Sequence, residues 1–233
     1  HATSANKIDF LLLRYQSDGQ LDTSFATNGF LKTDIGGSDY ARFIAIQPDG
    51  KILLAGGSFD FGTMIQLAVV RYNPDGSLDR NFGYSGVASS YFSAGNNSGQ
   101  TGSLGSLELQ ADGKILLAGS FADDIYRSGV GVVQFNADGM PDPTFGDDGQ
   151  ISIDISQEYV VNRAVLQPDG KILVSGYDRT VEDRDFVLMR FNPDGTLDTG
   201  FGANQLPLGS LKILGLTQVG QALLVESDLS DGN

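Results

Sequence analysis

The stretch that decides the fold is Gln47-Pro48-Asp49-Gly50-Lys51-Ile52-Leu53-Leu54-Ala55-Gly56, which returns with small changes at residues 110–119 and 167–176. A degraded fourth copy occupies residues 217–224. A second motif alternates with the first. It reads Leu-Ala-Val-Val-Arg-Tyr-Asn-Pro-Asp-Gly at residues 67–76, and its counterparts occupy residues 10–19, 130–139 and 186–195. Units that recur roughly every 60 residues are typical of a repeat architecture.

Each unit predicts four short strands. In the first unit these are residues 30–35, 43–46, 52–55 and 67–72, of which the first is expected to be the innermost. The two middle strands are joined by Pro-Asp-Gly, in which Pro presets φ for a turn and Gly accepts a positive φ, so they should form a hairpin. Repeated units of four antiparallel strands predict an all-β fold of the β-propeller type.

The strand count predicts one domain over residues 1–233 with four blades of four antiparallel strands. The expected boundaries are residues 29–76, 86–139, 149–195, and 205–227 together with 8–19. The chain starts with a strand that matches the fourth strand of a blade, and the other three strands of that blade do not precede it. The chain ends with a unit for which only the first three strands are predicted. We therefore expect the N-terminal strand to complete the last blade and close the ring, which removes an exposed strand edge.

A short connector follows each blade. Its first copy between complete units is Leu78-Asp79-Arg80-Asn81-Phe82-Gly83, and its counterparts begin at residues 21, 141 and 197. The aspartate is expected to cap a single helical turn by accepting a free backbone N–H. The phenylalanine three residues later is expected to be buried between neighbouring blades.

These units resemble the bacterial delta-60 repeat. The resemblance rests on Gln-Pro-Asp-Gly-Lys-Ile-Leu followed by Arg-Tyr-Asn-Pro-Asp-Gly-Ser-Leu-Asp, and it covers nearly the whole chain. The last unit departs from the pattern, because Val219-Gly220 replaces Asp-Gly and Glu226 stands where glycine is usual. The resemblance implies a β-propeller of uncharacterised function in a secreted or surface protein of bacteria. It supplies no catalytic residues.

Composition excludes several functions. The formal net charge of −14 is unsuited to nucleic acid or to an anionic membrane surface. The chain has no cysteine, which excludes disulfides, thiolate nucleophiles and Cys-ligated zinc. Its only histidine is His1, so a Ser-His pair is not available. The apolar runs are far too short to span a membrane, so no membrane insertion is expected.

A central channel is predicted between the innermost strands. Alignment of the units on Gly29, Gly86, Gly149 and Gln205 places four polar residues in register, namely Asp34, Tyr91, Asp154 and Ser210. In a four-bladed ring the two aspartates would face each other across the axis, where they could hold a cation. No other cofactor is expected. The alternative is that these residues line a hydrated opening.

The divergent connections between strands are the predicted binding surface, because they differ between units while the frame repeats. They contain polar and aromatic residues suited to recognition of a protein or glycan, namely Tyr40, Phe61, Asn96, Tyr126, Arg127, Tyr159, Arg179 and Arg184. The leading hypothesis is a monomeric, non-enzymatic binding module that is secreted or displayed on a surface. Two alternatives stay open: a carbohydrate-active enzyme that uses carboxylates and tyrosine at the channel mouth, and a structural spacer in a longer array.

Overall fold

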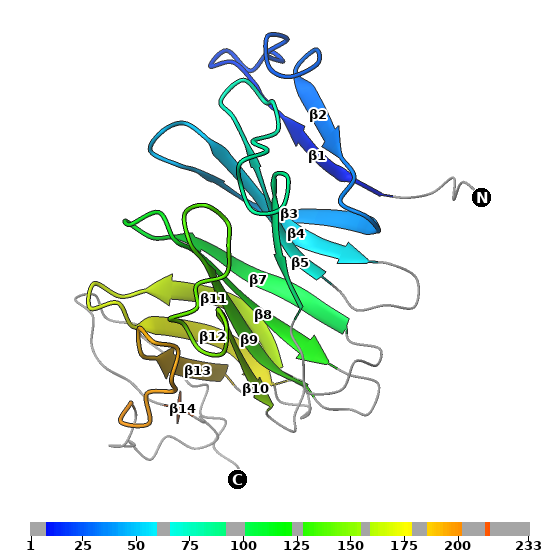
Figure 1. Ribbon diagram of the computed structural model, residues 1–233. Coiled ribbons are helices and arrows are strands. Elements are labelled where there is room, and N and C mark those ends of the chain that lie inside the picture. Colours follow the sequence, from blue (N-terminus) through cyan, green and yellow to red (C-terminus); the bar gives the residue numbers. More distant parts are fainter. Residues whose placement is uncertain are drawn as a thin grey trace.

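The computed structural model describes residues 8–59, 66–91, 101–122, 128–154, 159–178, 186–201 and 213–214, and these residues form strands and turns (Figure 1). A two-stranded antiparallel sheet, here called the half-sheet, consists of β1 (Phe10–Leu13) and β2 (Phe30–Thr33). Three four-stranded sheets follow it in chain order. The all-β prediction is confirmed for the described residues.

The strands of the three larger sheets are as follows. The first sheet contains β3 (Ser38–Ile46), β4 (Ile52–Phe59), β5 (Gln66–Tyr72) and β6 (Val87–Ser90). The second sheet contains β7 (Thr101–Leu109), β8 (Ile115–Ala122), β9 (Ser128–Phe135) and β10 (Gln150–Asp154). The third sheet contains β11 (Tyr159–Leu166), β12 (Ile172–Asp178), β13 (Phe186–Phe191) and β14 (Ile213–Leu214).

The predicted hairpins at the Asp-Gly-Lys stretches are confirmed. The backbone N–H of Gln47 donates to the carbonyl of Lys51 at 2.8 Å, and Gly50 adopts a φ of 82°. The side chain of Asp49 accepts the N–H of Lys51 at 3.1 Å. The same turn joins β7 to β8 and β11 to β12, so in each complete sheet this stretch connects the first strand to the second.

The fourth strand of each sheet differs from the prediction. Residues 30–35 were expected in one blade with residues 43–72, but β2 pairs with β1, and likewise β6 pairs with β5 and β10 with β9. The reason is the short connector, whose turn returns the chain onto the strand it has just left: the N–H of Arg71 donates to the carbonyl of Gly86 at 3.1 Å. The expected boundaries of 29–76, 86–139 and 149–195 are therefore replaced by sheets over residues 38–90, 101–154 and 159–214.

Between neighbouring sheets, β7 contacts both β3 of the first sheet and β11 of the third sheet (Figure 1). The hydroxyl of Ser106 donates to the carbonyl of Ala164 at 3.3 Å, and Arg42 donates to the hydroxyl of Ser103 at 3.1 Å. The prediction that β2, β6 and β10 are the innermost strands is therefore wrong, because β6 and β10 form the edges of their sheets opposite β3 and β7, and β2 pairs with β1 as β6 pairs with β5.

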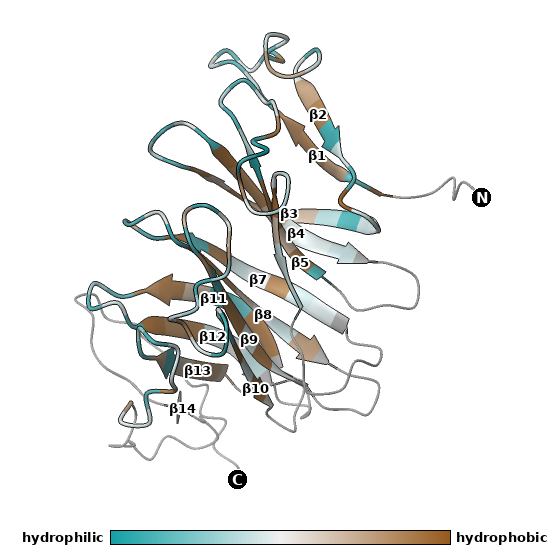
Figure 2. Ribbon diagram, in the orientation of Figure 1, coloured by the Kyte–Doolittle hydropathy of each residue, from teal (hydrophilic) through white to brown (hydrophobic). Residues whose placement is uncertain are grey.

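The hydrophobic core lies between the sheets. Successive side chains along a strand point to opposite faces of the sheet. A sheet that lies between two others packs against a neighbour on each face, so both of its faces are apolar. In β4, Leu53 and Ala55 pack toward the second sheet, whereas Ile52 and Leu54 pack toward the half-sheet. A third cluster joins the second and third sheets. Hydrophobic residues are accordingly concentrated in the strands, and the turns are hydrophilic (Figure 2).

The N- and C-terminal parts do not meet within the described residues. β1 pairs with β2, and β14, from the segment expected to form the last blade, runs parallel to β13 in the third sheet. Closure of the ring by residues 205–227 stays a prediction. The described residues contain no helix that is long and apolar enough to cross a membrane.

Candidate functional site

The antiparallel register sorts the connections between strands into two groups. All the Asp-Gly turns and connectors lie at one end of the sheets, which we call the repeated end. The other connections begin and end at the opposite end, which we call the variable end. The residues that border them are Thr33 and Ser38, Phe59 and Gln66, Ser90 and Thr101, Ala122 and Ser128, Asp154 and Tyr159, and Asp178 and Phe186.

The repeated end is organised around the connector aspartate. Asp79 is 5% exposed, and its Oδ2 atom lies 2.9 Å from Nε of Arg71 and 3.1 Å from Nζ of Lys51. Its other oxygen accepts the N–H of Asn81 at 3.2 Å, as expected of a capping residue, although the connector forms turns and no helix. The aspartate thus joins the hairpin, the third strand and the connector of one sheet.

The same network ties each unit to the next. The guanidinium of Arg71 lies 4.3 Å from the centre of the Phe82 ring, and its Nη1 atom donates to the carbonyl of Ala137 at 2.7 Å. The N–H of Gly83 donates to the carbonyl of Asp138 at 2.7 Å. Because Ala137 and Asp138 belong to the turn after β9, these bonds join the first sheet to the second. Phe82 is fully buried, as predicted for the connector phenylalanine.

The second and third sheets contain counterparts of this network. In the second sheet, Asp142 accepts hydrogen bonds from Lys114 at 2.8 Å and Gln134 at 2.7 Å. In the third, Asp198 lies 2.7 Å from both Lys171 and Arg190. Burial opposes ionisation of Asp142, but the hydrogen bonds from Lys114, Thr144 and Gln134 outweigh it and hold the pKa of this carboxyl well below its ordinary value. These charged side chains are therefore committed to the frame.

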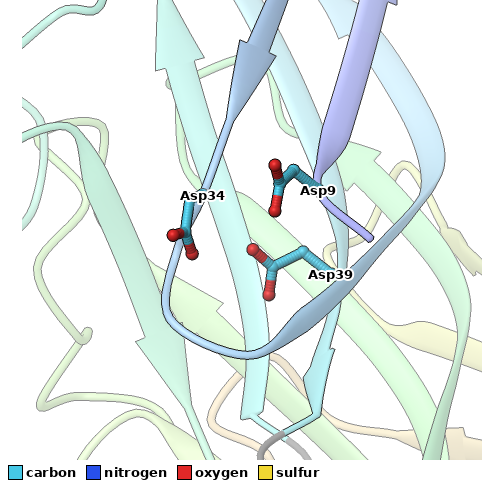
Figure 3. Close-up of side chains that lie close together, drawn as sticks. All are labelled: Asp9, Asp34 and Asp39. Atoms are coloured by element: carbon cyan, nitrogen blue, oxygen red, sulfur yellow. The ribbon is translucent and has the colours of Figure 1, made fainter. Parts of the chain in front are cut away.

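Three aspartates meet at the variable end where the half-sheet adjoins the first sheet (Figure 3). Asp9 precedes β1, Asp34 follows β2, and Asp39 lies near the start of β3. One carboxylate oxygen from each lies within 4.8 Å of the others. Carboxylates in such a group could together bind a divalent cation.

Hydrogen bonds and ion pairs of the protein account for this acidic cluster. Asp39 is 1% exposed, and it accepts the N–H of Ile35 at 2.7 Å and the hydroxyl of Ser58 at 2.5 Å. Asp9 forms an ion pair with Lys32, and Asp34 accepts the N–H of Gly36 at 2.9 Å. The cluster therefore fixes the turn between β2 and β3.

The predicted site residues are distributed as follows. Tyr40 in β3 is 49% exposed, and Tyr91, which directly follows β6, is 41% exposed. Both lie at the variable end. Asp154 is the last residue of β10 and Tyr159 is the first residue of β11, and the structure describes the backbone of both residues but not their side chains. The remaining predicted residues lie outside the described ranges, namely Phe61, Asn96, Tyr126, Arg127, Arg179, Arg184 and Ser210.

The predicted channel group does not have the expected position. Tyr91 follows β6, which forms the edge of the first sheet opposite β3, and Asp34 follows β2, which belongs to the half-sheet. Asp34 lies instead beside Asp9 and Asp39, two residues that the sequence did not single out. Asp39 is not part of the repeated pattern, because Gly102 occupies the matching register in the second sheet.

A family model described as "Domain of unknown function (DUF5122) beta-propeller" matches residues 2–25, 47–82, 110–145 and 167–201, which is more than half of the chain. The chain belongs to this family. Each DUF5122 segment ends at the connector phenylalanine. The last three segments begin at the glutamine that opens the hairpin turn, namely Gln47, Gln110 and Gln167. The family pattern therefore includes the network of the repeated end. No curated protein matches the chain.

The match confirms that the sequence consists of β-propeller repeats. The finer resemblance to the delta-60 repeat stays a prediction. Tyr40 and Tyr91, the exposed tyrosines described at the variable end, lie outside the DUF5122 segments. The family segments contain the network of the repeated end, and they also include five of the predicted surface residues, namely Phe61, Tyr126, Arg127, Arg179 and Arg184.

Proposed function

We propose that this DUF5122 chain is a non-enzymatic binding module that contacts a protein or glycan through its variable end. The observation that carries the proposal is the separation of the two ends by strand register. The connections that repeat lie at one end, and those that differ border the other. Binding surfaces are commonly formed by divergent loops on a rigid frame.

The chemistry of the two ends supports this assignment. At the repeated end, the cations Lys51, Lys114 and Lys171 form ion pairs with aspartates of their own sheets. At the variable end, Tyr40 and Tyr91 expose large parts of their side chains, and because Tyr84 at the repeated end is exposed as well, binding measurements must distinguish the two ends. An exposed tyrosine offers both an apolar ring and a hydroxyl, a combination that is enriched where proteins bind partners.

The architecture in this proposal is a closed four-unit propeller in a secreted or surface protein. In it, β1 and β2 form the outer half of the fourth unit, because they correspond to β5 and β6 of the first sheet. Two further strands would complete the unit and remove the free edge of β1. A rigid closed frame would hold the variable connections in fixed positions.

The test compares tyrosines at the two ends. The full chain is screened on an array of soluble polysaccharides and extracellular proteins, and each binder is measured again with Tyr40→Ala, Tyr91→Ala and Tyr84→Ala. Tyr84 is the matched control, since it is 72% exposed and lies in a connector at the repeated end. We expect one or both variable-end substitutions to weaken binding about tenfold or more, and the control to leave it unchanged. A screen without any binder would support the spacer hypothesis.

A further inference from the structure

Within the part of the chain that the structure describes, β1 is flanked by a strand on one edge only. β5 pairs with β6 on one edge and with β4 on the other, and β9 and β13 are likewise flanked on both edges. β1 pairs with β2 on one edge, and no described strand pairs with the other. An edge strand of this kind can accept a further strand through its backbone N–H and C=O groups.

β1 exposes apolar side chains on one face. Leu11, Leu13 and Tyr15 are 54%, 42% and 61% exposed. Their counterparts in the first sheet are 0%, 0% and 1% exposed, and these residues are Ala68, Val70 and Tyr72. Val70 and Tyr72 belong to a cluster with Phe10 and Leu12, so the half-sheet covers this face of the first sheet, and no described sheet covers the same face of β1.

Among the described residues, the connector aspartate of the half-sheet has one cationic partner fewer than Asp79 and Asp198. Oδ2 of Asp22 holds Nε of Arg14 at 2.8 Å. In each complete sheet the corresponding oxygen also holds a lysine from the hairpin turn of the same sheet, at 3.1 Å for Lys51, 2.8 Å for Lys114 and 2.7 Å for Lys171. No described lysine occupies this position beside Asp22. A lysine directly after the turn glycine would supply a second cation.

The register specifies the residue that would follow this lysine. In the complete sheets the residue after that lysine is isoleucine, and it lies directly opposite the aromatic residue that ends the third strand. The pairs are Ile52 with Tyr72, Ile115 with Phe135, and Ile172 with Phe191. Tyr15 is the corresponding aromatic residue of the half-sheet. An isoleucine opposite it would cover its exposed ring.

The last unit of the chain does not carry this pair of residues. Gln221 and Ala222 stand where the other units have lysine and isoleucine. In addition, Ile213 and Leu214 from the same unit pair with β13 in the third sheet. The complementary hairpin therefore has an Asp-Gly-Lys-Ile sequence and differs from residues 217–222.

We infer that the half-sheet is a docking surface for a β-hairpin of the Asp-Gly-Lys-Ile type, supplied by a further unit of this repeat. The hairpin adds its second strand to the free edge of β1, its lysine forms an ion pair with Asp22, and its isoleucine covers Tyr15. This inference rests on the proposed architecture, in which β1 and β2 form half of a unit. It is independent of what the variable end binds.

The experiment adds a synthetic peptide with the sequence of residues 43–57, which contains Lys51, to the full chain. Binding is followed by the rise in Tm and by amide chemical shifts of β1. We expect binding that weakens about tenfold with Asp22→Asn or with a Lys51→Gln peptide, because each change removes the charged hydrogen bond. The two changes together should weaken it no further. Asp18→Asn is the matched control, an exposed aspartate in the neighbouring turn.

A fusion removes the cost of folding a free peptide. A copy of residues 38–59 is joined to the N-terminus through a flexible linker, which makes docking intramolecular. The inference predicts a higher Tm than for the same fusion carrying Lys51→Gln in the added copy. It is overturned if neither the peptide nor the fusion has an effect, if Asp22→Asn leaves the effect unchanged, or if a peptide of residues 211–226 binds more tightly. The last result would identify the chain's own last unit as the occupant.

Discussion

Nζ of Lys114 lies 2.8 Å from Oδ2 of Asp142, and this contact joins the hairpin turn of the second sheet to the connector that leads out of it. Lys51 and Asp79 make the same connection in the first sheet. The Asp-Gly-Lys and Leu-Asp-x-x-Phe elements of the sequence recur together because their side chains contact one another. Repetition in this chain therefore marks residues that hold the frame together.

Replacement of Asp142 by asparagine should destabilise the protein. The carboxylate is 3% exposed and accepts hydrogen bonds from Lys114, Gln134 and Thr144. Hydrogen bonds to charged groups contribute about 1.5–3 kcal/mol each, so we expect a loss on the order of 2 kcal/mol in the free energy of unfolding. Denaturant titration measures it, with Asp112→Asn at an exposed turn position as the control. Equal effects of the two substitutions would contradict the role of Asp142.

Stability should fall in acid. The pKa values of Asp79, Asp142 and Asp198 are lowered from the ordinary 3.8. Burial opposes this shift at the first two, where the hydrogen bonds outweigh it, and the hydrogen bond from Lys171 is the main cause at the third. The folded state then holds protons less readily than the unfolded state. The stabilisation is complete above about pH 4 and is lost as the pH falls through the lower folded-state values.

Denaturant titrations at pH 5, 4, 3 and 2 check this dependence. The free energy of unfolding should be nearly constant between the first two conditions and decrease through the last two. The decrease should be smaller in the Asp142→Asn variant, because one of the titrating groups is gone. An unfolding free energy that does not change down to pH 2 would contradict the lowered pKa values.

Two turn glycines with nearly equal backbone conformations should respond differently to alanine. Gly19 and Gly139 have φ values of 83° and 85°. A Cβ on Gly139 would lie 2.7 Å from the buried ring of Phe82, whereas a Cβ on Gly19 would meet nothing within 4 Å. We expect Gly19→Ala to cost about 1 kcal/mol through backbone strain and Gly139→Ala to cost distinctly more. Thermal unfolding compares them, and equal losses would show that the Phe82 contact is unimportant.

Arg71 should not be replaceable by lysine. Its guanidinium stacks on Phe82, holds Asp79 and donates to the carbonyl of Ala137 in the next unit. Lysine keeps the charge but cannot donate in two directions from a plane. We expect Arg71→Lys to destabilise the protein by about 1–2 kcal/mol, measured by denaturant titration. Arg80→Lys on the exposed side of the same connector is the control and should have almost no effect.

The hairpins and the repeat class could be predicted because local turn chemistry determines them. Pro48, Asp49 and Gly50 specify a turn whatever the sheets do around it. The buried connector phenylalanine was also predictable, since Phe25, Phe82 and Phe145 recur at one position and are all fully buried. These features depend on contacts within one unit or between adjacent units.

The order of strands was not predictable in the same way. Residues 30–33 could pair with the strand before them or with the strand after them, and both arrangements preserve the alternation of side chains. The choice depends on the geometry of the connector turn, in which Tyr84 accepts and donates backbone hydrogen bonds with Val87. The predicted channel failed for this reason, because it took β2, β6 and β10 as central.

The acidic cluster could not be found from the residues that the repeats share. Asp9 and Asp34 come from different strands of the half-sheet, and Asp39 has no acidic counterpart in the second sheet. The three carboxylates lie close together because of the turn that connects β2 to β3. A search for positions at which a unit departs from its copies would have identified Asp39, and the same search identified Tyr40.

The most direct test of the account is the comparison of Tyr40→Ala and Tyr91→Ala with Tyr84→Ala in binding to a glycan or protein obtained from the array screen. All three tyrosines are exposed, and they differ in the end of the sheets at which they lie. If the variable end is the binding surface, one or both of the first two substitutions weaken binding about tenfold or more while the third leaves it unchanged. Loss of binding with Tyr84→Ala, together with unchanged binding for Tyr40→Ala and Tyr91→Ala, would place the site at the repeated end and contradict the account.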